Sequence, residues 1–122
     1  MPNRDLRVPV AEWAKMRDLA LVLRNAPNAS NEDIAVTLGI PRATTYRHVA
    51  RLQQLTESRS PREMVERLQD GRLTVNGDPI PRLPVHLATK VQALNAVIAQ
   101  RQAVRAWQER ARATRNLHRA RR

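Results

Sequence analysis

The chain has 122 residues and no cysteine, which limits it to one small domain with an extension and excludes disulfides and thiolate metal sites. Its 22 lysines and arginines outnumber 11 aspartates and glutamates, and the resulting net charge of +11 indicates a polyanionic partner. No apolar run approaches the ~18 residues of a membrane span and the start lacks an apolar leader, so we expect a cytoplasmic protein without a membrane partner.

The chain should begin with a loose segment and an amphipathic helix. Residues 1–8 are short and polar, and we expect them to form a flexible arm. Apolar residues recur at three- and four-residue steps over residues 9–25, which predicts a helix with one buried face. Trp13 lies on that face, and we expect it in the core rather than in a ligand site. This helix should be the first of a three-helix unit that covers residues 9–55.

Two shorter helices joined by a tight turn follow. Ser30 and Asp33 have the spacing of a capping box, which predicts a helix that starts directly after the serine. Gly39 suits the left-handed residue that ends this helix, and Pro41 presets the first turn of the next. The next helix is expected over residues 42–55, because apolar side chains recur on one of its faces. The segment is therefore expected to be a helix-turn-helix.

The stretch LGIPRATTYRHVARL resembles the recognition segments of IclR-type regulators and serine recombinases. The residues that carry the likeness are Ala35, Gly39, Ile40, Pro41, Arg42, Ala43, Thr44, Tyr46 and Arg47. Thr45 and His48 depart from it, because such families usually have aliphatic residues at these places. The resemblance implies that the second helix enters the major groove of double-stranded DNA. The side chains expected to touch DNA are Arg42, Thr44, Tyr46, Arg47 and Arg51.

Residues 56–84 are expected to connect this unit to the last part of the chain. Ser60 and Glu63 repeat the capping-box spacing with a proline at the first helical position, so a short helix is expected over residues 61–69. The pair Asn76-Gly77 is typical of a hairpin turn, although nearby prolines remove donors from the returning strand. Two interpretations stay open: a short hairpin that acts as a wing beside DNA, or a rigid turn between helices.

A long basic helix is expected over residues 85–122, because neither glycine nor proline interrupts the chain there. Four apolar residues with four-three-four spacing predict an interface between copies of the chain: Leu87, Val91, Leu94 and Ile98. We expect a homo-oligomer, most simply a dimer, with a ring as the alternative. Three arginines near the end are expected to contact phosphates without reading sequence, with a solvated tail as the alternative: Arg112, Arg115 and Arg119.

The sequence thus predicts a mainly α fold, with an N-terminal three-helix helix-turn-helix domain, a possible short β-hairpin and a long C-terminal helix. The three histidines lack metal-ligand spacing and the glycines are isolated, so we expect no enzyme, cofactor, metal or small-molecule ligand. The expected function is a small transcriptional regulator or repressor of bacterial, phage or plasmid origin. Alternatives are a phage terminase small subunit, which the layout resembles, an accessory protein of recombination or plasmid maintenance, and a docking module that does not bind DNA.

Overall fold

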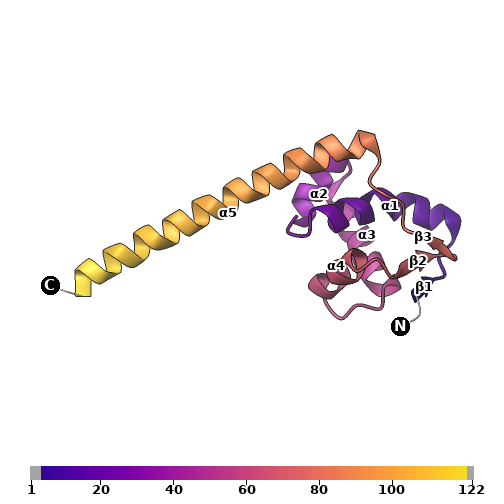
Figure 1. Cartoon of the computed structure of the whole chain (residues 1–122), viewed down its shortest axis with the longest axis horizontal. Coiled ribbons are helices and arrows are strands. Elements are labelled where there is room, and N and C mark those ends of the chain that lie inside the picture. The colour runs from indigo at the N-terminus through magenta and orange to yellow at the C-terminus, as the bar shows by residue number, and fades with distance from the viewer. Residues whose placement is uncertain (1–3, 121–122) are drawn as a thin grey trace.

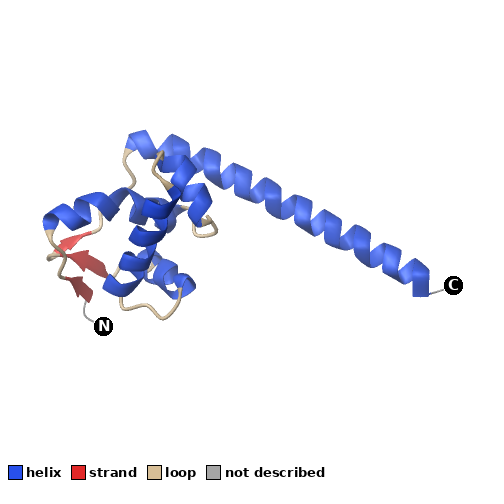
Figure 2. Ribbon diagram, turned by 180° about the vertical axis from the view of Figure 1, so that it is seen from behind, coloured by secondary structure: helices blue, strands red, loops and turns tan. Residues whose placement is uncertain are grey.

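The computed structural model describes residues 4–120 and consists of a helical domain from which one long helix projects (Figures 1 and 2). The domain contains the helices α1 (Val10–Asn25), α2 (Asn31–Leu38), α3 (Arg42–Leu55) and α4 (Pro61–Gln69). A small sheet and the projecting helix complete the described range: β1 (Arg4–Leu6), β2 (Leu73–Val75), β3 (Asp78–Pro79) and α5 (Val85–Ala120). The expected mainly α fold is confirmed, including the three-helix unit, the short hairpin and the long last helix.

Local hydrogen bonds fix both ends of α2. The Ser30 hydroxyl accepts from the Asp33 amide at 3.1 Å, and the Asp33 carboxylate accepts from the Ser30 amide at 2.9 Å, so the expected capping box is complete. At the other end Gly39 has a φ of 66°, and the amide of Ile40 donates to the carbonyl of Ala35 at 3.1 Å. This left-handed conformation strains any residue with a Cβ. The three-residue turn that follows leads directly into α3.

The core of the domain combines side chains from all five helices with side chains from β1 and β2. Met16 and Leu19 of α1 are fully buried among them, and Trp13 packs at the edge. Thr45, at one of the two positions that depart from the aliphatic pattern, is also fully buried, and its hydroxyl donates to the Pro41 carbonyl at 3.1 Å. The polar residue therefore leaves no unpaired hydroxyl in the core.

The sheet corrects the expectation that residues 1–8 form a flexible arm. Residues 1–3 lie outside the described range, but β1 pairs in parallel with β2, and Leu6 is aligned with Val75. Leu6 and Val8 are buried. The apolar side chains of this segment cover the core, and the backbone groups of β1 form their hydrogen bonds with the edge of β2. The beginning of the described chain is thus part of the domain.

A hairpin turn closes the other edge of the sheet. Asn76 and Gly77 have φ angles of 52° and 86°, as a type I′ turn requires, and β2 pairs antiparallel with β3. The Asn76 side chain also holds the beginning of the chain, because its amide group donates to the Val8 carbonyl at 2.6 Å and its oxygen accepts from the Val8 amide at 3.0 Å. The first of the two open interpretations is therefore right about the hairpin, while a contact with DNA stays a prediction.

The first part of α5 is packed against the domain that precedes it. Four side chains of α5 that were expected to form an oligomer interface are buried within the single chain: Leu87, Val91, Leu94 and Ile98. Helices α1 and α2 cover this face of α5, which corrects the assignment of these residues to an interface between copies. Beyond Ile98 no described side chain of α5 is buried, and the helix projects away from the domain (Figure 1). None of the helices within residues 4–120 combines the length and apolarity of a membrane span.

Candidate nucleic-acid interface

The solvent-exposed face of α3 carries the side chains that were expected to touch DNA. Thr45, Val49 and Leu52 turn one face of the helix into the core. The opposite face and its flanks are exposed, and they comprise Arg42, Ala43, Tyr46, Arg47, Ala50, Arg51 and Gln54. Thr44 lies half-buried at the edge of this face. We call the exposed set the α3 face.

Arg47 occupies the middle of the α3 face. Ala43 and Ala50 lie one turn before it and one turn after it on the same side of the helix, and both are exposed. Its Nη2 donates to the Thr44 hydroxyl at 3.3 Å, and no described carboxylate forms an ion pair with it. Of the four positions nearest to Arg47 on the helix surface, two are alanines and one is Thr44, while the fourth is Arg51. The side with the two alanines allows a flat or grooved partner to come close. Tyr46 lies beside it with 48% of its surface exposed.

The other two arginines of the α3 face are held by carboxylates of neighbouring helices. Arg42 forms an ion pair with Glu32, which is in the first turn of α2. The Nε of Arg51 donates to Glu12, in the first turn of α1, at 2.6 Å. Both pairs are exposed to solvent, so an incoming anion can compete for either guanidinium. Neither carboxylate has a sequence signal that marks it as a partner, because each arginine is brought to it by the fold.

The ion pair between Glu12 and Arg51 keeps both partners charged near neutral pH. The hydrogen bond from Arg51 lowers the pKa of Glu12, and the same bond raises the pKa of Arg51. Partial burial by itself raises the pKa of Asp33, but the hydrogen bonds from the Ser30 amide and from Arg101 outweigh it and leave that pKa lowered. Because their pKa values are lowered, the carboxylates of Glu12 and Asp33 are ionised at any pH near neutrality at which the arginines could bind phosphates.

The basic end of α5 is separated from the α3 face. Arg112, Arg115 and Arg119 are exposed on the part of α5 that projects beyond the domain, so the structure does not gather them with Arg47 (Figure 1). Nearer the domain, Arg101 of α5 is bound to α2, because its Nη2 lies 2.8 Å from both carboxylate oxygens of Asp33. The spacing of residues along the chain gave no indication of this contact.

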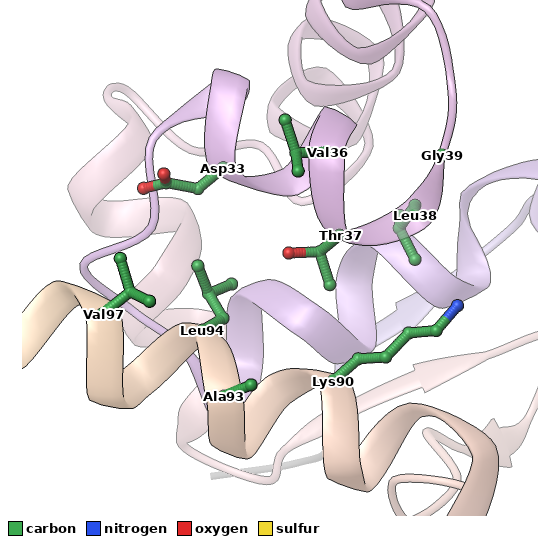
Figure 3. Close-up of a pocket in the computed structure, with 9 residues that line it drawn as sticks. All are labelled: Asp33, Val36, Thr37, Leu38, Gly39, Lys90, Ala93, Leu94 and Val97. Carbon is green, nitrogen blue, oxygen red and sulfur yellow. The ribbon is translucent and has the colours of Figure 1, made fainter.

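A shallow hollow of about 540 Å³ lies between α2 and α5. Figure 3 shows its lining, which comprises Asp33, Val36, Thr37, Leu38, Gly39, Lys90, Ala93, Leu94 and Val97. The lining is mostly apolar, and the carboxylate of Asp33 at one end is already bound by Arg101 and Ser30. The hollow therefore offers few polar groups that could orient a small ligand.

The part of the chain that the structure describes contains no cluster of three or more His, Cys, Asp or Glu residues that could hold a metal ion. The arrangement instead offers arginine and hydroxyl donors on the α3 face and a series of exposed arginines along α5. These are groups that bind phosphate and base edges. Comparisons with protein families, with curated proteins and with solved structures found no match to this chain.

Proposed function

We propose that this protein binds a defined site on double-stranded DNA by placing the α3 face in the major groove. The observation that carries the proposal is the position of Arg47, which stands without a described carboxylate partner between Ala43 and Ala50. A helix is about 10–12 Å in diameter and the major groove about 12 Å wide, so small side chains around a central arginine favour close contact with base edges. Arg47 can then donate two hydrogen bonds to a guanine.

The residues around Arg47 have supporting roles in this proposal. Arg42 and Arg51 contact phosphates on either side of the groove, after a phosphate replaces Glu32 or Glu12 as their partner. Thr44 and Tyr46 contact a base edge or a phosphate. The net charge of +11 supports a polyanionic ligand.

Occupancy of a DNA site gives the simplest biological role, a small transcriptional regulator in the cytoplasm or nucleoid of a bacterium. A second candidate is a recognition factor for DNA packaging, and the observation that favours it is the length of α5 beyond the domain. This part of α5 exposes Val104 and Trp107, which are 48% and 64% exposed, so it offers apolar surface for assembly. Oligomeric state separates the two roles, because a dimer fits a regulator and a ring of many subunits fits packaging.

Selection of bound sequences from a random duplex pool, followed by mobility-shift titration, tests the proposal. Arg47→Ala should weaken binding of the enriched duplex by about 5- to 150-fold, which corresponds to ~1–3 kcal/mol for a lost guanine contact. Binding of a scrambled duplex should change much less. Arg62→Ala is the matched control, because Arg62 is an exposed arginine on α4 with a single carboxylate partner. A pool without enrichment, or an equal loss on both duplexes, would contradict sequence reading by α3.

A further inference from the structure

The arginines of α5 continue the line of side chains that anchors this helix to the domain. The buried residues Leu87, Val91, Leu94 and Ile98 alternate steps of four and three. The same alternation continues without a break through Arg101, Arg105, Gln108, Arg112, Arg115 and Arg119. Such a line drifts by about 20° per seven residues on an α-helix, hence by about 60° between Ile98 and Arg119, and its arginines stay within about one quarter of the helix circumference. The line therefore changes from apolar to cationic at Arg101 and keeps to the side of α5 that the domain occupies.

We call Arg101, Arg105, Arg112, Arg115 and Arg119 the arginine row. Within the described residues only its first member has an ion-pair partner, because Arg101 binds Asp33 and no salt bridge involves the other four. Glu109 is the single acidic residue after Ile98, against eight arginines, so residues 99–122 carry a net charge of +7 out of +11.

The stability of the helix does not account for this row. Cations three and four residues apart repel one another, and interleaved acids would relieve the repulsion. Cations also favour the carboxyl end of a helix, but that effect is confined to the last turn, and the row begins 18 residues before Arg119. Glu109 is the single acid at such a spacing, four residues after Arg105 and three before Arg112. A row of exposed arginines with so few carboxylates is instead suited to an external anion with evenly spaced charges.

The row begins at α2, the helix that also contacts the start of α3. Glu32 and Asp33 are neighbours in the first turn of α2, where Glu32 binds Arg42 of α3 and Asp33 binds Arg101 of α5. One turn of α2 thus joins the start of α3 to the start of the row. From Arg101 to Arg119 the row is about 27 Å long at 1.5 Å per residue, which matches about eight base pairs of duplex.

We infer that the arginine row binds the phosphate backbone of duplex DNA next to the segment that α3 contacts, without reading its sequence. This inference rests on the proposed function, because the position of α3 on DNA decides which flank the row reaches. Each arginine of the row replaces condensed counterions at a phosphate, so the row adds affinity that salt removes.

A matched pair of variants tests the row. Arg112 belongs to it, whereas Arg110 lies about 160° away around the same helix. Both substitutions, Arg112→Gln and Arg110→Gln, remove one charge at nearly the same height. On a mixed-sequence duplex of about 30 base pairs, Arg112→Gln should make the slope of log affinity against log salt shallower by about 0.9, and Arg110→Gln should leave it unchanged. The triple substitution of Arg112, Arg115 and Arg119 by glutamine should reduce the slope by about 2.7.

Circular dichroism of each variant should give an unchanged helix signal, since these side chains touch no other described element. Equal slope changes for Arg110→Gln and Arg112→Gln would mean that the charge of α5 acts diffusely and that the row is not the contact. An unchanged slope in the triple variant would mean that the row does not contact DNA. The measurement does not require that the mixed-sequence duplex contain a site that α3 prefers. The test of the row therefore stands even if Arg47→Ala shows that α3 reads no sequence, and a failure of the row leaves α3 unaffected.

Discussion

Removal of the Glu12 charge should strengthen DNA binding. The carboxylate of Glu12 accepts from Arg51 at 2.6 Å, with both side chains partly exposed, so a phosphate can take the guanidinium only by displacing Glu12. An exposed pair of this kind adds little to folding, so Glu12→Gln should leave the melting temperature nearly unchanged. On DNA it allows Arg51 to meet its phosphate without displacing a carboxylate.

The size of the effect follows from counterion release. In the parent, the displaced Glu12 carboxylate attracts a cation as the phosphate releases one, whereas in Glu12→Gln the Arg51 contact gives a full net release. The slope of log affinity against log salt should therefore be steeper by about 0.9 in Glu12→Gln, and its advantage roughly 3.5-fold larger at 50 mM than at 200 mM salt. The advantage should not change between about pH 6 and 8, because the hydrogen bond from Arg51 lowers the pKa of Glu12 and keeps it ionised in the parent protein. Fluorescence anisotropy with a labelled duplex measures both quantities.

Glu66→Gln is the matched control for this prediction. It removes the same charge from an exposed pair, in which Glu66 Oε1 lies 3.5 Å from Arg62 Nε on α4, away from the α3 face. The same gain in both variants would mean that net charge alone is responsible. No gain in Glu12→Gln would mean that Arg51 does not meet a phosphate.

Further predictions concern the stability of the domain. Leu94→Ala should lower the free energy of unfolding in urea by about 2–5 kcal/mol, with a midpoint independent of protein concentration, because Leu94 is buried within its own chain; a midpoint that rises with concentration would point to an interface after all. Ser30→Ala should cost about 1 kcal/mol through loss of the N-cap, and an unchanged stability would contradict the cap. Asp33 has a lowered pKa in the folded chain, so its contribution is present above its ordinary pKa and is lost as the pH falls through the folded value. Asp33→Asn should therefore make unfolding less sensitive to pH below about 4, and a parallel acid titration of both proteins checks this.

Helix starts and the turn between α2 and α3 could be predicted from the sequence, because their causes are local. The hydroxyl of Ser30 needs only the amide three residues later, and Gly39 needs only its own φ. The start of α4 after Ser60 has the same kind of signal, although there Glu63 pairs with Arg67 at 2.7 Å instead of closing a second capping box. Signals of this kind lie within four residues, so they do not depend on how the rest of the chain folds.

Contacts between distant residues could not be predicted in the same way. The pairing of β1 with β2 joins residues 69 positions apart, and nothing in the short segment before α1 indicates a partner. The stripe that contains Leu94 has the same pattern whether it packs on its own domain or on a second copy, so periodicity alone could not choose between them. The partners of Arg42 and Arg51 depend on how α1 and α2 are placed around α3.

Ile98 is the last residue of the core cluster along the chain, and its position decides how much of the chain the domain needs in order to fold. Leu6 near the beginning and Ile98 in α5 belong to one core cluster, so the domain cannot close before α5 has been translated as far as Ile98. No described residue after Ile98 is buried, so nothing translated later is needed to complete that core. A released chain that ends soon after Ile98 therefore contains every side chain of this core cluster, and it should already resist proteolysis.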